Sequence, residues 1–68
     1  MTIEEDVALQ IKAARTKLGY SQRRLAELCG MSYPQLARIE TAKNSVSIGI
    51  LERICKPLGL KIKLDRAE

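Results

Sequence analysis

A serine or threonine precedes each apolar segment in the first 58 residues of this chain. These residues are Thr2, Ser21, Ser32 and Ser47. A hydroxyl side chain in this position accepts a hydrogen bond from the first turn of a helix. Gly19 and Gly30 follow the first two segments, and a glycine there adopts the left-handed conformation that ends a helix. The pattern therefore predicts four short helices.

Between these caps, apolar residues recur every three or four positions, which is typical of helices that bury one face. The residues expected to face inward are Ile3, Val7, Ile11, Ala14 and Leu18 in the first helix, Leu25, Ala26, Leu28 and Cys29 in the second, Leu36 and Ile39 in the third, and Ile48, Leu51, Ile54, Cys55 and Leu58 in the fourth. Pro57 is predicted to end or distort the fourth helix near Lys56, because a proline disfavours helical backbone in the residue before it.

The pattern changes at residues 60–64, where apolar and basic residues alternate as in a half-buried β-strand. No other segment has this alternation, so we expect the strand to pair antiparallel with the same strand of a second copy. The predicted dimer contacts are Leu58, Leu60, Ile62 and Leu64. The alternative is a frayed C-terminal tail. The predicted fold class is all-α, with a short C-terminal β-strand that pairs across a homodimer.

The chain has 68 residues, no histidine and two cysteines, and we expect a single domain over residues 1–68. This composition excludes Ser-His-Asp and Cys-His catalysis and any zinc site that needs histidine. There is also no glycine-rich phosphate loop and little volume for a substrate pocket. We therefore expect no enzymatic activity, no cofactor and no metal, and free thiols at Cys29 and Cys55.

The first residues include the acids Glu4, Glu5 and Asp6, whereas a signal peptide starts with basic residues. No apolar run approaches the length of about 20 residues that a transmembrane helix needs. We therefore expect a cytoplasmic protein with no membrane partner.

Residues 21–41 meet the geometric requirements of a helix-turn-helix, in which two short helices meet at a steep angle. Ala26 is small enough for the close crossing, and Gly30 tolerates positive φ in the turn. Apolar residues stand before, within and after the turn at Leu25, Cys29, Met31, Leu36 and Ile39. Residues 12–43 contain seven basic and two acidic residues, a net charge of +5 against +4 for the whole chain. This positive charge favours DNA binding over the alternative of an ordinary helical hairpin.

Several short motifs together resemble the XRE family of Cro and lambda-type repressors, over residues 10–60. They are Leu18-Gly19-Tyr20-Ser21-Gln22, Leu25-Ala26 and Gly30-Met31-Ser32. The resemblance implies a lambda-repressor-like DNA-binding domain in which Arg15 and Glu40 form a salt bridge, the alternative being two solvated charges. The family usually has glycine after the third helix, where this chain has Thr41-Ala42-Lys43, so the left-handed residue is expected at Asn44.

In a helix-turn-helix the second helix enters the major groove, and its N-terminal residues reach base edges. Arginine can read guanine and glutamine can read adenine, each with two hydrogen bonds. A tyrosine can contact a thymine methyl group or a phosphate. The predicted DNA-binding residues are Gln22, Ser32, Tyr33, Pro34, Gln35, Arg38, Lys43 and Asn44, with Gln22 matched to the family residue that holds the DNA backbone. For Arg23 and Arg24, DNA contact and a solvated helix face both stay open.

The C-terminal segment 58–64 after a helix-turn-helix is similar to that of HipB-type antitoxins, in which the strands of two chains form a small sheet. This resemblance implies a homodimeric repressor that binds a palindromic operator and neutralises a HipA-type kinase toxin in a type II toxin–antitoxin operon. Such a protein would act at the nucleoid. The alternatives are a stand-alone or phage-type regulator with no toxin, and a module whose main role is to bind another protein.

Overall fold

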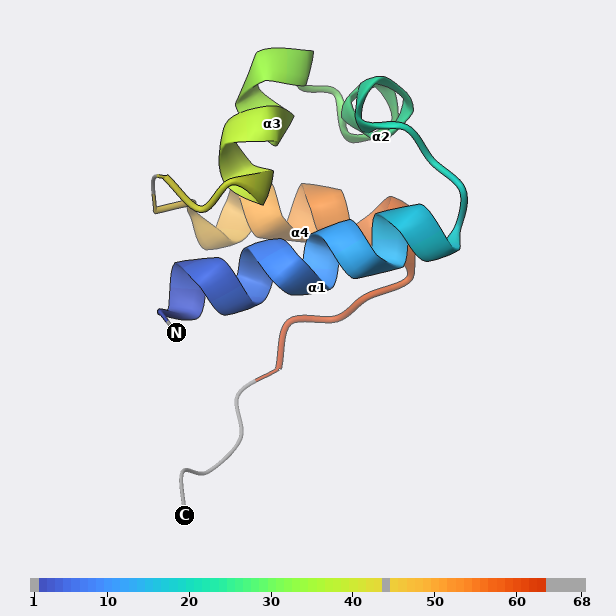
Figure 1. Ribbon diagram of the computed structural model, residues 1–68. Helices are drawn as coiled ribbons and strands as arrows, with labels where there is room; N and C mark the ends of the chain where they lie inside the picture. The colour runs from blue at the N-terminus through green and yellow to red at the C-terminus, as the bar shows by residue number, and fades with distance from the viewer. Residues whose placement is uncertain (1, 44, 64–68) are drawn as a thin grey trace.

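The computed structural model describes residues 2–43 and 45–63, so Asn44 and Leu64, both predicted contact residues, lie outside the described residues. The described part contains four helices and no strand. They are α1 (Ile3–Lys17), α2 (Gln22–Cys29), α3 (Tyr33–Glu40) and α4 (Ile48–Leu58). In Figure 1, α1 and α4 run alongside each other, and α2 and α3 lie together above them. The prediction of an all-helical domain with four helices is confirmed for the described residues.

The four hydroxyl residues predicted to cap the helices lie at the helix N-termini. The hydroxyl groups of Thr2, Ser21, Ser32 and Ser47 accept hydrogen bonds from the backbone N–H groups of Glu5, Arg24, Gln35 and Ile50, respectively. Glu5 completes a capping box, because its carboxylate accepts the backbone N–H of Thr2 at 2.7 Å. These bonds satisfy N–H groups that the first turn of a helix leaves without partners.

The last residue of α4 lies two positions beyond the end predicted near Lys56. The helix continues through Pro57 to Leu58. Pro57 lacks the N–H that would bond to the carbonyl of Arg53, and its ring crowds that carbonyl. Only Leu58 follows it in α4, so little of the helix lies beyond this disturbance. Gly59, with a φ of 70°, then ends the helix in the left-handed conformation.

The loop after α3 also contains a left-handed residue. Ala42 has a φ of 58°, although alanine rarely adopts this conformation. The sequence had suggested Asn44 for this position. Thr41 stabilises the preceding turn, because its hydroxyl donates to the carbonyl oxygen of Arg38 at 2.8 Å. The backbone strain at Ala42 costs about 1–3 kcal/mol, by the general scale for such conformations.

Each helix contributes one large, fully buried aliphatic side chain to the core. These are Ile11, Leu25, Leu36 and Ile54, none more than 2% exposed. Four residues that were predicted to face inward are instead exposed: Ile3 by 73%, Leu18 by 51%, Leu28 by 40% and Ile48 by 72%. Ile3 and Ile48 are the first residues of their helices, Leu18 follows the last turn of α1, and Leu28 lies at the edge of the inward arc of α2. Helical periodicity identifies the buried face and does not show where along a helix its neighbours begin or end.

Residues 60–63 follow α4 without forming a strand in this single chain. Leu60 packs against the core, whereas Ile62 is 44% exposed. Leu58, expected among the dimer contacts, is only 6% exposed and lies in the core of its own chain. The segment passes below α1 in Figure 1, on the opposite side of α1 and α4 from α3.

A part-buried ion pair joins α1 to α3. Arg15 Nε lies 2.8 Å from Glu40 Oε2, and Arg15 Nη2 donates to Glu40 Oε1 at 3.1 Å. The side chains of Arg15 and Glu40 are 11% and 2% exposed, respectively. Arg15 Nη1 also donates to the carbonyl oxygen of Tyr20 at 2.8 Å, and Gln22 Nε2 donates to Glu40 Oε1 at 3.1 Å. These bonds connect α1, the loop after it, the start of α2 and the end of α3.

A second long-range connection holds the end of α2. Arg53 of α4 donates from Nη2 to the carbonyl oxygen of Gly30 at 2.7 Å and from Nε to that of Cys29 at 3.2 Å. The last carbonyl groups of a helix lack partners within the helix and attract positive charge. Arg53 therefore fixes the turn between α2 and α3 against α4.

Arg15→Ala and Glu40→Ala are each expected to lower the free energy of unfolding, because each leaves the partner's charge buried and unpaired. A double-mutant cycle measured by denaturant unfolding should give a coupling of about 0.5–3 kcal/mol. The exposed pair Arg24–Glu27, with atoms 3.9 Å apart, is the matched control and should give a smaller coupling. Additive losses at Arg15 and Glu40 would show that the two charges act independently.

Gly30→Ala is expected to destabilise the fold more than Gly19→Ala does, as measured by thermal or denaturant unfolding. Both glycines have positive φ, 69° and 78°, so both substitutions introduce backbone strain of about 1–3 kcal/mol. Only at Gly30 would the new Cβ meet another group, Arg53 Nη2 at 3.0 Å, whereas the space at Gly19 is open. Equal losses would show that Arg53 moves aside without cost.

Candidate nucleic-acid interface

The turn between α2 and α3 is compact because small and left-handed residues occupy it. Ala26 is 2% exposed, and its carbonyl oxygen accepts the backbone N–H of Met31 at 3.0 Å. Gly30 adopts a φ of 69° and ends α2. Ser32 then caps α3 after only one intervening residue. This is the arrangement of two short helices that residues 21–41 predicted.

After the turn, α3 packs against α1 and α2 with one face, and its other face is exposed. Leu36 is fully buried, and Ala37 and Ile39 are half-buried on the same side of the helix. The exposed residues at the start and along the outer face of α3 are Ser32, Tyr33, Pro34, Gln35 and Arg38. The structure therefore exposes Ser32, which caps α3, together with the four α3 residues predicted to contact DNA.

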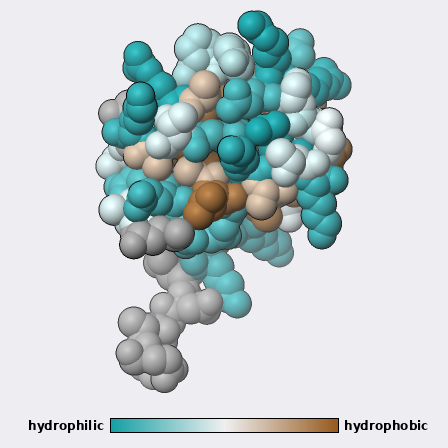
Figure 2. Space-filling model, in the orientation of Figure 1, coloured by the Kyte–Doolittle hydropathy of each residue, from teal (hydrophilic) through white to brown (hydrophobic). Residues whose placement is uncertain are grey.

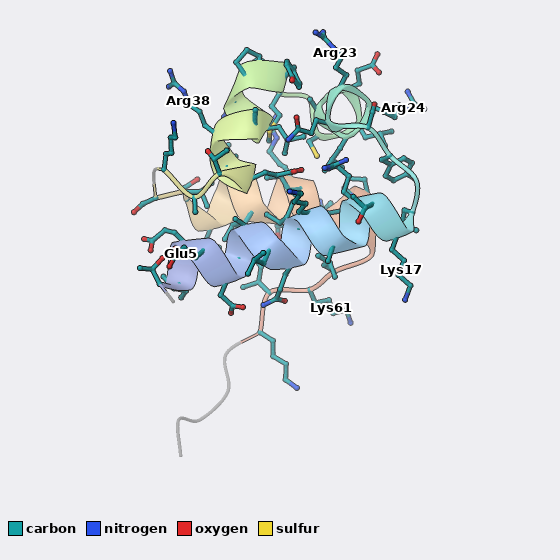
Figure 3. All side chains as sticks on the ribbon, viewed as in Figure 1. Glu5, Lys17, Arg23, Arg24, Arg38 and Lys61 are labelled. Atoms are coloured by element: carbon teal, nitrogen blue, oxygen red, sulfur yellow. The ribbon has the colours of Figure 1, made fainter. Side chains whose placement is uncertain are left out.

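Basic side chains surround this face. Arg23 and Arg24 on α2 and Arg38 on α3 project from the end of the molecule that α2 and α3 form (Figure 3). Lys43 is exposed in the loop after α3. Hydrophilic residues dominate the surface in the same orientation (Figure 2). An exposed, positively charged helix face of this kind suits the phosphate-lined major groove of B-DNA.

An open groove runs beside α3 on the side of α4. Its lining includes Ser32, Gln35 and Arg38 from the α3 side and Ser45 and Ser47 from the following loop. Ser45 is held in place, because its hydroxyl donates to Glu4 Oε2 at 3.1 Å. The apolar residues Pro34, Ile39, Val46 and Ile50 complete the lining, so the groove presents hydroxyl, amide and guanidinium groups beside aliphatic side chains.

Gln22 is half-buried at the first position of α2, and its amide nitrogen is committed to Glu40. This bond fixes the orientation of the side chain and connects a predicted DNA-backbone contact to the Arg15–Glu40 pair. Lys43 has no such restraint in the described part of the structure and lies one residue beyond the left-handed Ala42.

Two long-range contacts near the turn were not predicted from the sequence. One is the pair of hydrogen bonds from Arg53 to the end of α2, described above. The other is a cation–π contact, in which the guanidinium carbon of Arg23 lies 4.5 Å from the centroid of the Tyr33 ring. Both involve residues on different helices, and no local pattern marks such pairs.

Neither cysteine thiol is activated as a nucleophile. Both cysteines are free. Burial raises the pKa of the Cys29 thiol, although the nearby Arg53 charge partly offsets this, and burial also raises the pKa of the Cys55 thiol. Thiols with a raised pKa stay protonated near neutral pH and react slowly. Among the described residues, no group of three or more cysteine, aspartate or glutamate side chains could hold a metal ion.

Over residues 2–43 and 45–63, no helix has the length and apolar character needed to cross a membrane. A comparison with protein-family models matches residues 11–64 to the helix-turn-helix family, and a search of curated proteins found no match. The match spans all of α2, the turn and α3 and most of the chain. The chain therefore belongs to the XRE-type helix-turn-helix family of DNA-binding regulators.

Proposed function

We propose that this protein is a homodimeric transcriptional repressor that acts inside the cell, at the nucleoid, on a palindromic operator. The observation that carries this proposal is the two-sided α3, which buries Leu36 completely and exposes Tyr33, Gln35 and Arg38. The second helix of a helix-turn-helix enters the major groove with its N-terminal residues on the base edges. A bound dimer blocks access to the DNA that it covers, which supports repression.

The exposed side chains divide into two roles by their chemistry. Arg38 and Gln35 each carry groups that form two hydrogen bonds to one base, guanine and adenine respectively. Lys43, in the loop after α3, suits a phosphate, as does the hydroxyl of Ser32. Asn44 belongs with Lys43 in this proposal because it is the next residue in the chain.

Dimerisation through residues 60–64 completes the proposal. The alternation of Leu60, Ile62 and Leu64 with lysines suits a strand that pairs antiparallel with its copy. Leu60 packs against the core and attaches the segment to its own chain. Ile62 is 44% exposed and is an apolar side chain that a second copy could cover.

We further propose that the protein is the antitoxin of a type II operon, with a HipA-type kinase as its partner. The support is the similarity of the helix-turn-helix followed by the alternating segment 58–64 to HipB-type antitoxins. Co-expression with the product of the adjacent gene tests this role directly. A stable complex with a kinase-like protein, and loss of that protein's toxicity, is the expected result, whereas independent purification of the two would contradict it.

Arg38→Ala and Lys43→Ala are expected to weaken DNA binding in different ways. Loss of a guanine contact at Arg38 should cost about 1–3 kcal/mol on the preferred site and much less on random DNA. Loss of a phosphate contact at Lys43 should weaken binding to every sequence and reduce the salt slope by about one unit. Titrations of both variants against preferred and random duplexes at several salt concentrations measure this. Equal effects on both duplexes from Arg38→Ala would contradict its base-reading role.

Ile62→Asp is expected to convert the dimer to a monomer, because it places a carboxylate in an apolar contact next to its copy near the two-fold axis. The variant should sediment as a monomer, melt at a temperature independent of protein concentration, and lose operator binding while it keeps weak non-specific affinity. Lys61→Asp, one residue earlier on the opposite face of the strand, is the matched control and should leave the dimer intact. A dimeric Ile62→Asp protein with normal operator binding would contradict pairing through this strand.

A further inference from the structure

Arg23 and Tyr33 lie on the two helices of the motif and meet across the turn. Arg23 is the second residue of α2, and Tyr33 is the first residue of α3. The guanidinium carbon lies over the ring, 4.5 Å from its centroid. Both residues are exposed, and the tyrosine side of the pair lies at the helix end that meets base edges in this family of motifs.

The neighbouring arginines differ in their partners. Arg24 lies 3.9 Å from the carboxylate of Glu27, whereas Arg23 has no ion pair within the described ranges. No carboxylate among the described residues therefore pairs with the charge of Arg23. Its contact with the ring uses the face of the guanidinium, and the N–H donors at the edges of the group stay available for an anion.

The guanidinium of Arg23 therefore contacts the ring of Tyr33 while the ring stays exposed to solvent. It is 38% exposed, beside a small hollow whose lining includes Ala26, Glu27 and Met31. An exposed tyrosine at the start of a helix has several accessible rotamers. The guanidinium favours the rotamer that lies against it and leaves the rest of the ring toward the surface that α3 presents.

We propose that Arg23 is a positioning residue for Tyr33, and that the pair forms one composite contact, with the ring on a thymine methyl group and the guanidinium on the adjacent phosphate. This inference rests on the proposed function, because it assigns a base position to the α3 surface. Thymine is the base that offers an apolar group in the major groove. Lysine in place of Arg23 would keep the charge but lacks the planar face that lies on the ring.

The test begins with the full-length protein and a pool of random DNA duplexes, from which the preferred sequence is selected. Each thymine of that sequence is then replaced by deoxyuridine, which removes only the methyl group. One thymine position in each half-site should be sensitive, and its replacement in a single half-site should weaken wild-type binding about fourfold, the factor that corresponds to one buried methyl group. Tyr33→Ala should bind the two duplexes equally.

The informative variant is Arg23→Lys. It should lose the discrimination between thymine and deoxyuridine while the salt dependence of binding stays unchanged, because the charge is kept. Arg24→Lys, one residue along the same helix, is the matched control and should keep the full discrimination. A purely structural role for Arg23 would instead change the melting temperature and reduce affinity for both duplexes equally.

A measurement without DNA tests the positioning itself. The ring current of Tyr33 should shift the side-chain proton resonances of Arg23 upfield, and Tyr33→Leu should abolish this shift while the circular dichroism stays helical. Unshifted Arg23 resonances in the wild-type protein would contradict the positioning role, whatever the DNA results.

The outcomes separate the two proposals. If the wild-type protein enriches no sequence, the proposed function fails and this inference fails with it. If a sequence is enriched but Arg23→Lys keeps the discrimination, or no thymine depends on Tyr33, this inference alone is overturned.

Discussion

Arg15 binds both carboxylate oxygens of Glu40 at the end of α3, where only 2% of the glutamate side chain is exposed. Charges removed from water to this extent are stable only when hydrogen bonds satisfy them from several directions. Here the carbonyl oxygen of Tyr20 accepts from Arg15, and Gln22 donates to Glu40. The requirement for these partners fixes the relative positions of α1, the start of α2 and the end of α3. The position of the exposed α3 surface depends on this geometry.

α3 is consequently held at both ends and along one side. Glu40 anchors its C-terminal end, Leu36 is buried in the core, and the turn before it is bonded to Arg53 of α4. A helix fixed in this way loses little conformational entropy when it binds a ligand, so the entropy cost subtracts less from the free energy of binding. The exposed residues of α3 therefore act from a rigid support. The strain at Ala42 lies just beyond this anchored helix, in the loop that carries Lys43.

The sequence was sufficient for the features that depend on neighbours along the chain. The four hydroxyl caps, the left-handed Gly30 and the buried face of α3 follow from spacing and backbone preference, and the structure has them. Spacing was insufficient for features that depend on where helices cross. It placed Leu28 and Ile48 inside, although both are exposed, and it gave no sign of the Arg53 or Arg23–Tyr33 contacts. Pro57 shows a further limit, because the local rule for the residue before a proline placed the end of α4 near Lys56, whereas the helix ends at Leu58.

In a dimeric helix-turn-helix protein, two recognition helices bind two half-sites of the DNA, so the distance between the helices must match the distance between the half-sites. Half-sites on one face of B-DNA are about 34 Å apart, so the contact between two copies must be as well defined as the contact with DNA. Residues 60–63 leave α4 on the side of the molecule away from α3 (Figure 1). A dimer formed through this segment would leave the α3 surface open to DNA. Leu60 packs against the core, and the Arg15–Glu40 pair joins α1 to α3. The packing of Leu60 would therefore fix the dimer contact relative to these helices.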